Sequence, residues 1–208
     1  MNQAADEAST RMVDVMYPLD EATVPDDHAC ALADAVRRVL PWFDDEPEAG
    51  ILQISGMAQG NGERYVGRRS RLVLRLPIHR AASADSLAGA QLDLGGAVLT
   101  VGASSIRQLL PARGVVYSHL VSVDVADEVE FLARCRALLD ARGLRAQLIT
   151  GKTHQLRGAQ GSVQGFSLML HGLGAAESLA MQETGLGAHR ALGCGIFIPH
   201  KSVVAVGE

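Results

Sequence analysis

The chain has 208 residues, of which 48% are hydrophobic, and it carries a formal net charge of −4. This length allows one ordinary domain or two small ones, and the apolar content is that of a protein with a packed core. No apolar run is long enough to cross a membrane, and residues 1–15 lack the basic and apolar pattern of a secretory signal. We therefore expect a cytoplasmic protein that contacts no membrane.

The three cysteines, Cys30, Cys135 and Cys194, lie far apart and form no C-x-x-C pair. An odd number at this spacing favours reduced, buried thiols over a disulfide framework or a zinc site. The histidines and carboxylates also show no metal-ligand spacing on a predicted element. The sequence thus predicts no metal site, and we expect no cofactor.

The charges are unevenly distributed along the chain. Residues 1–48 contain 12 of the 23 acidic residues and three of the 19 basic ones, a net of −9, whereas the remaining residues have a net of +5. All the basic residues except Lys152 and Lys201 are arginines, whose planar guanidinium groups fit phosphate oxygens. A nucleic-acid partner is therefore compatible with the negative total.

The periodicity of the first half predicts the element order β-α-β-β-α-β. Asp26 or Asp27 can cap the first helix, and Pro41 ends it. The predicted elements are a strand at 11–19, a helix at 25–40, strands at 50–56 and 69–77 around a turn-rich segment at 57–64, a short helix with a Gly-Gly turn within 80–96, and a strand within 97–111.

The second half repeats this order. Its predicted elements are a strand at 115–125, a helix at 127–143 that stops at Gly143, strands at 146–151 and 163–172 around a polar hairpin at 152–162, a helix at 175–183 and a strand at 194–204. The fold class predicted from this repetition is α+β, with two tandem ferredoxin-like (RRM-like) domains at 11–111 and 115–206 joined near 111–114.

The loop before the last strand contains two Gly-apolar-Gly units five residues apart. A dinucleotide-binding motif is excluded, because that motif follows a strand and opens a helix, whereas here a helix precedes and a strand follows. One glycine can cap the helix, and the others would allow close backbone approach and leave N–H groups exposed to anions. His189 and Arg190 between them could reach phosphates; the alternative is a loose surface loop. The four glycines are Gly185, Gly187, Gly193 and Gly195.

Nearly the whole chain after the first ten residues resembles a known family. The segments "VDVMYPLD…VPDDHACAL", "SRLVLRLP" and "GLGAHRALGCGIFIP" are similar to the "Cas six" family of CRISPR repeat-processing endoribonucleases, in its MYXAN-type branch. That family belongs to the RAMP superfamily of tandem ferredoxin-like proteins. The resemblance implies that the chain cuts CRISPR precursor RNA within each repeat without a metal ion. The 2′-hydroxyl would attack the adjacent phosphorus and give a cyclic phosphate and a 5′-hydroxyl.

The resemblance also implies a catalytic histidine on or near the first helix, the position of His28. By its own position, His28 lies in the first turn of an amphipathic helix, where the helix N-terminus favours neutral imidazole and attracts phosphate. Asp26 and Asp27 act in the opposite direction, so its role as acid or base stays open. The alternative is a capping-turn or partly buried histidine. Tyr17 and Lys152 are candidate helpers.

Strand 69–77 offers one candidate RNA-binding face. Alternation places Arg69, Arg71 and Arg75 on one side, with Arg68 pointing the other way. Such a face can also be a solvated sheet edge. Lys152, His154, Arg157, His189 and Arg190 of the second half would complete a basic groove. Aromatic residues make up only 4% of the chain, and no base-stacking pair is evident on the central strands, so backbone and hairpin recognition by arginine is favoured.

The resulting hypothesis is a metal-independent CRISPR RNA endoribonuclease that binds a repeat stem-loop and cleaves near its base. It could keep the mature guide RNA and join other subunits of a Cascade-like effector complex. The alternative is a non-catalytic RAMP subunit that binds guide RNA within such a complex. A third, weaker possibility is a ferredoxin-like protein that binds a small acidic ligand.

Overall fold

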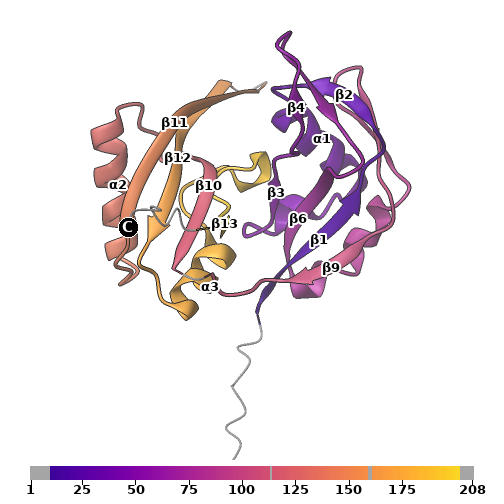
Figure 1. The fold of residues 1–208 in the computed structure, drawn as a ribbon. Coiled ribbons are helices and arrows are strands. Elements are labelled where there is room, and N and C mark those ends of the chain that lie inside the picture. The colour runs from indigo at the N-terminus through magenta and orange to yellow at the C-terminus, as the bar shows by residue number, and fades with distance from the viewer. Residues whose placement is uncertain (1–9, 113, 159–160, 202–208) are drawn as a thin grey trace, which may run out of the picture.

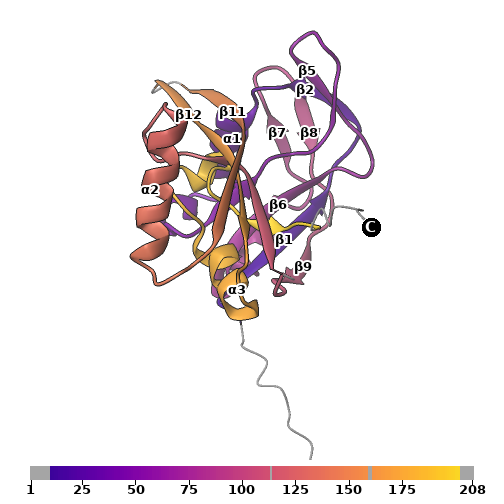
Figure 2. The ribbon, with the colours of Figure 1, turned by 60° about the vertical axis from the view of Figure 1, so that its left-hand side comes forward.

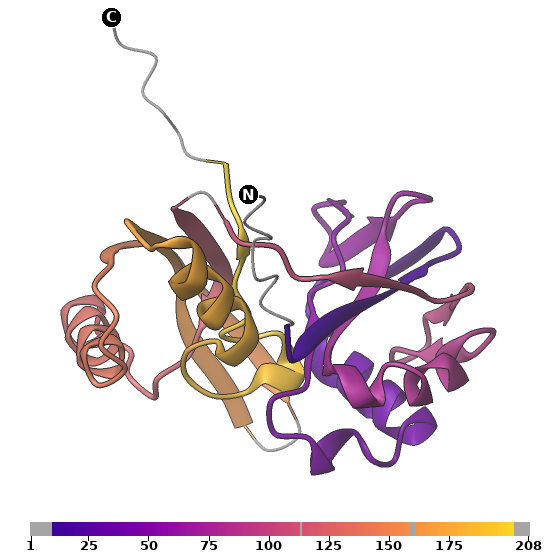
Figure 3. The ribbon, with the colours of Figure 1, turned by 90° about the horizontal axis from the view of Figure 1, so that it is seen from below.

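A computed structural model describes residues 10–112, 114–158 and 161–201. The chain folds into two α+β halves that lie side by side, with the glycine-rich loop, yellow in Figure 1, between them. Seen from below, the segment between β9 and β10 carries the chain from the first half to the second (Figure 3). All the strand pairings described below are antiparallel.

A four-stranded sheet forms the centre of the first half, in the order β3-β6-β1-β9. Its two central strands are long because their alternating apolar residues share one buried face: Val13 and Val15 of β1 face the same core as Leu72 and Leu74 of β6. The strands are β1 (Met12–Pro18), β3 (Gly50–Leu52), β6 (Arg71–Pro77) and β9 (Ser105–Gln108).

Helix α1 (Ala29–Val39) covers the apolar face of this sheet with Leu32, Ala33 and Val36. The helix ends before Pro41, as the sequence predicts. The prediction that Asp26 or Asp27 caps its start is wrong. The N-cap residue is His28, and no side-chain cap hydrogen bond is formed; the Asp27 carboxylate instead accepts a hydrogen bond from the backbone N–H of Arg157 at 3.0 Å.

The rest of the first half is more irregular than the sequence predicts. The turn-rich segment carries β4 (Met57–Ala58) and β5 (Glu63–Val66), which pair with β2 (Ala22–Pro25). Segment 80–96 contains the 3₁₀ turn η3 (Ser83–Leu87) instead of an α-helix, and two further 3₁₀ turns, η1 (Phe43–Asp45) and η2 (Ile78–Arg80), come before it. The strand within 97–111 is divided into β8 (Val98–Thr100), which pairs with β7 (Gln91–Asp93), and β9. The small sheets lie at one end of this half (Figure 2).

The second half contains a four-stranded sheet in the order β11-β12-β10-β13. Helix α2 lies on its outer face, away from the first half (Figures 1 and 3). The Asp127 side chain caps α2, and Gly143 follows it at a φ of 70°. The elements are β10 (Val115–Val121), α2 (Glu128–Asp140), β11 (Gln147–Gly158), β12 (Gly161–His171), α3 (Ala175–Thr184), η4 (Arg190–Leu192) and β13 (Ile198–Pro199).

One expectation for this half is confirmed with longer strands, and one is corrected. The polar hairpin predicted at 152–162 is present as the antiparallel ends of β11 and β12, which are longer than predicted because every second residue of an exposed strand can remain polar. The last strand is limited to two residues, Ile198 and Pro199, within the described part of the chain; residues 202–204 of the prediction lie outside it.

Each half has its own apolar core. Phe43, Ile51 and Leu87 join the core of the first, and Phe131, Phe166 and Phe197 join that of the second. A smaller cluster joins the halves, with Ala29 of α1 against Leu120 and Leu156 of the second sheet. In the described ranges, no helix is long and apolar enough to cross a membrane.

Candidate nucleic-acid interface

A pocket of about 250 Å³ lies where the two halves meet. Its first-half wall contains Gln53 and Ser55, which come after β3 in the chain, and Arg64 of β5. Its second-half wall contains Tyr117 and His119, together with residues of the glycine-rich loop and the last strand. The remaining lining residues are Leu52, Ile54, Gly193, Ile196 and Ile198. The pocket thus combines an apolar floor with a guanidinium group and an imidazole.

His28 lies at the start of α1, beside a second and smaller pocket that shares Leu52 and Gln53 with the first. Its exposed fraction is 5%. The structure therefore has the capping-turn, buried histidine that the sequence left as the alternative, because the apolar contacts that place α1 on the second half also cover its first residues. Ala191 and Leu192 of the glycine-rich loop line the same small pocket.

The His28 imidazole is held in one orientation. Its Nδ1 lies 2.8 Å from the carbonyl oxygen of Pro25. A carbonyl oxygen only accepts hydrogen bonds, so the neutral ring that makes this bond carries its proton on Nδ1 and leaves a lone pair on Nε2. Burial is the main cause that lowers the pKa of His28. The ring is therefore neutral at pH 7 and suited to accept a proton.

The two aspartates before His28 each make a contact with another part of the chain. Arg64, which sequence reasoning missed, forms an ion pair with Asp26 at 3.2 Å and is close enough to help lower the pKa of both His28 and His119. The Asp27 carboxylate fixes the backbone of Arg157 on β11. The segment before α1 is thus tied to both halves, and Arg64 lies beside both histidines.

His119 is the second residue that sequence reasoning missed. It lies exposed on β10, and its ring centroid is 4.1 Å from that of His154 on β11. Although the residue keeps an exposed edge, desolvation of the ring by neighbouring groups, followed by the charges of His154 and Arg64, lowers the pKa of His119 to about 4. The alternation of "VYSHL" already places Tyr117 and His119 on one strand face, and this was the signal that could have identified them.

The glycine-rich loop allows close backbone approach, as predicted. Gly185 ends α3 with a φ of 65°, and a side chain at Gly187 or Gly195 would collide with the carbonyl oxygen of Ser122 or Leu186. The expectation of exposed N–H groups is wrong for several residues. The backbone N–H groups of Ala188 and Gly195 donate to Ser122 and Leu120, at 3.0 and 2.7 Å. The loop is therefore a packed junction, and its exposed members include Gly187 and His189.

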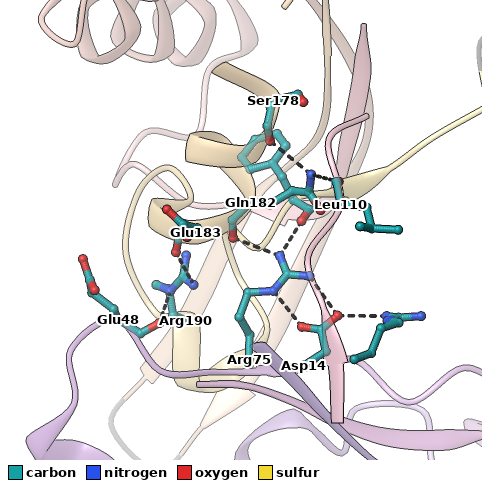
Figure 4. Close-up of polar contacts among 10 residues, drawn as sticks. Asp14, Glu48, Arg75, Leu110, Ser178, Gln182, Glu183 and Arg190 are labelled. Carbon is teal, nitrogen blue, oxygen red and sulfur yellow. Dashed lines mark hydrogen bonds and ion pairs between the residues drawn. The ribbon is translucent and has the colours of Figure 1, made fainter. Parts of the chain in front are cut away.

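Arg75 is buried between the halves, contrary to the prediction that it lines an open strand face (Figure 4). Arg71 and Arg75 do lie on the face opposite Leu72 and Leu74, but the second half covers that face at Arg75. The Arg75 guanidinium pairs with Asp14 at 2.8 Å and donates to the backbone carbonyls of Gln182 and Phe197. Arg75 thus joins the two halves and does not reach RNA from this position.

Arg190 is also buried, which corrects its expected role as a phosphate contact. Its guanidinium donates to the carbonyl oxygens of Glu48 at 3.0 Å and Glu183 at 3.1 Å (Figure 4). Burial, with Arg75 nearby, lowers its pKa to about 10. Nη1 of Arg190 has no hydrogen-bond partner among the described residues. Each of these two arginines therefore lies in one half and donates hydrogen bonds to backbone carbonyls of the other half.

The other predicted residues are placed as follows. Arg68, Arg69, Arg71, Lys152 and Arg157 are exposed, and His154 is half-buried. Arg68 forms an ion pair with Glu21 at 2.9 Å.

Tyr17 is fully buried and donates to the Ala84 carbonyl at 2.7 Å, so its suggested role as a helper of His28 is wrong. Within the described residues, no group of three or more His, Cys, Asp or Glu side chains could hold a metal ion.

The fold is similar to that of solved Cas6-related and Cse3 structures. A solved structure titled "Characterization of a Cas6-related gene from Pyrococcus furiosus" superimposes with a TM-score of 0.64 at 15% identity, over 90% of this chain and 98% of that one. A Thermus thermophilus Cse3, "bound to an RNA representing a pre-cleavage complex", gives 0.53 at 16% identity, over 90% and 98%.

The chain belongs to the Cas6 family of CRISPR-associated endonucleases. The family model described as Cas6 CRISPR matches residues 13–202. The CRISPR-associated endonuclease Cas6 of Myxococcus xanthus (strain DK1622) is 36% identical over 192 residues, which cover 90% of this chain and 81% of the relative. The family predicted from the histidine segment and the glycine-rich loop is confirmed.

Proposed function

We propose that this protein binds CRISPR precursor RNA and cleaves it once in each repeat without a metal ion, then keeps the mature guide RNA. The observation that carries this proposal is the relationship to the M. xanthus endonuclease over most of both chains. The relationship also favours an enzyme over a non-catalytic RAMP subunit. The free cysteines fit a reducing compartment, and we place the reaction in the cytoplasm. Association with other subunits of a Cascade-like complex is part of the proposal.

We propose that the two halves are tandem ferredoxin-like domains, at 11–111 and 115–206. Support comes from strand order: in each sheet, the second, third, first and fourth core strands along the chain stand side by side, as β3-β6-β1-β9 and β11-β12-β10-β13. Helix α1 and helices α2 and α3 supply the crossover elements. In the first domain, the 3₁₀ turns η2 and η3 occupy the place of the second helix.

The proposed reaction is attack of a ribose 2′-hydroxyl on the adjacent phosphorus. The O2′–P bond forms and the P–O5′ bond breaks, which gives a 2′,3′-cyclic phosphate and a 5′-hydroxyl. The O2′ proton moves to a base, and the leaving O5′ receives a proton. This chemistry needs proton-transfer groups and positive charge near the phosphate. The imidazole of His28 and the guanidinium of Arg64 provide a proton-transfer group and a positive charge at the junction of the two halves.

We assign the base to Nε2 of His28. Its lone pair follows from the Nδ1 contact with Pro25, and burial keeps the ring neutral. The sequence alone left acid and base open; the hydrogen bond favours the base. The ring is only 5% exposed, so the assignment requires that the small pocket between Gln53 and Ala191 widens when RNA binds.

The proposed RNA path follows the exposed basic residues on both sides of this junction. Lys152, His154 and Arg157 lie on β11, and His189 is exposed on the glycine-rich loop. Arg68, Arg69 and Arg71 precede or begin β6 in the first half. The loop glycines act by shaping the packed turn that places His189, and Arg75 and Arg190 act by holding the halves together.

The test is cleavage of end-labelled repeat RNA by the purified protein in excess EDTA. We expect cleavage at one position, with a 2′,3′-cyclic phosphate end that resists phosphatase until acid opens it to a phosphomonoester, and that accepts a 3′-ligated adapter only after both treatments. A matched RNA with a single 2′-deoxynucleotide at the cut position should bind equally well and remain intact. Loss of cleavage in EDTA, or cleavage of the deoxy-substituted RNA, contradicts the mechanism.

A further inference from the structure

Four rings lie on one face of the second sheet. Tyr117 and His119 are two residues apart on β10 and therefore point the same way. Their neighbour Val116 points the other way, into the core that contains Phe131 of α2. Because α2 covers the outer face (Figure 1), the rings of Tyr117 and His119 face the first half.

These rings are paired. The centroid of Tyr117 is 5.5 Å from that of His200, which follows β13. The centroid of His119 is 4.1 Å from that of His154, with the planes tilted by 46°. Tyr117 and His154 are half-buried, whereas His119 and His200 are exposed. In each pair, one ring is therefore partly enclosed, and the other ring keeps surface exposed to solvent.

A glycine makes the second pair possible. β12 runs between β10 and β11, and Gly165 of β12 stands opposite His154 in register. A side chain at Gly165 would collide with the carbonyl oxygen of Val121, beside the irregular end of β10. Without one, β10 passes close to β12, and the two imidazoles meet across the strand.

The pocket in front of these rings has the chemistry of a nucleotide site. Leu52, Ile54, Ile196 and Ile198 give it apolar surface, and Gln53 and Ser55 offer hydrogen-bonding groups. Arg64, whose Nε pairs with Asp26 at 3.2 Å, offers the remaining N–H groups of its guanidinium. Its volume of about 250 Å³ is slightly below the range of roughly 300–1,000 Å³ of usual small-molecule pockets. One nucleotide fits this size better than a duplex.

We propose that this pocket binds one unpaired nucleotide of the RNA, with its base against the rings of Tyr117 and His119 and its phosphate at Arg64. Taking RNA as the ligand rests on the proposed function, but occupation of the pocket does not require cleavage. Proteins bind unpaired nucleotides by stacking bases on aromatic and histidine rings. The pKa of His119, lowered to about 4, keeps this ring neutral at pH 7, so stacking desolvates no charge.

The first experiment follows histidine ring signals by ¹H–¹³C NMR during titration with adenosine 5′-monophosphate. We expect the His119 and His154 signals to shift and saturate. His79 of η2, an exposed histidine paired with Glu46, is the control, and its ring signals should not shift. Ribose 5-phosphate should give much smaller ring shifts because it lacks the base. Equal shifts for His79, or none for His119 at millimolar nucleotide, overturn the proposal.

The second experiment compares two stem-loop RNAs, one with unpaired flanking nucleotides and one blunt. Tyr117→Leu and His119→Ala should each weaken binding of the flanked RNA by about tenfold, within the measured range for loss of one stacking ring, and change blunt-RNA binding little. Equal losses on both RNAs contradict the nucleotide site. If the wild type neither binds nor cleaves repeat RNA but still binds the mononucleotide, the proposed function fails and this site stands.

Discussion

At the scale of single residues, Arg75 illustrates how a charged residue can join two domains. Its guanidinium is buried with Asp14 and bonds to carbonyls of the other half. Removing one partner of a buried ion pair costs about 3–5 kcal/mol when the remaining charge is left unpaired, but Asp14 keeps a second ion pair with Arg107 at 2.8 Å. We therefore expect Arg75→Met to lower the free energy of unfolding by about 3 kcal/mol, the lower end of this range, in urea titrations.

Arg71 is the matched control, because it lies on the same face of β6 but is exposed. We expect Arg71→Met to change the free energy of unfolding by less than about 0.5 kcal/mol, as is usual for surface substitutions. The salt dependence of RNA affinity separates the two roles further: a lost phosphate contact reduces the slope by about 0.7 for single-stranded RNA. Arg75→Met should leave that slope unchanged, and a reduced slope would restore Arg75 as an RNA contact.

At the scale of elements, the glycine-rich loop acts as a packed junction. Gly195 has a φ of 66°, and a Cβ there would collide with the Leu186 carbonyl. Gly60 has a φ of 80° with no atom within 4 Å of the equivalent position. We expect Gly60→Ala to cost about 1–2 kcal/mol, the penalty of the left-handed backbone alone, and Gly195→Ala to cost clearly more. Equal losses in denaturant titrations would show that close packing at Gly195 contributes nothing.

At the scale of the whole molecule, sequence periodicity predicted the sheets and the long helices well, because one face of each is apolar. Leu72, Leu74 and Leu76 lie in the core as their alternation predicts. What it could not predict is how the halves cover each other. Arg75 and Arg190 have the local sequence of exposed bases, and His28 lies beside an apolar stripe, yet contacts between residues more than 100 positions apart bury all three side chains.

The most direct test of this account is the single-turnover cleavage rate of His28→Ala, measured beside its RNA affinity. Removal of a general base should reduce the rate by about 10²–10⁴-fold and leave affinity within a few-fold of the wild type. Burial lowers the pKa of His28, and protonation removes the lone pair of the base, so the wild-type rate should fall as the pH drops through this lowered pKa. A wild-type rate in the variant, or an equal loss of affinity and cleavage, would contradict the assignment of His28.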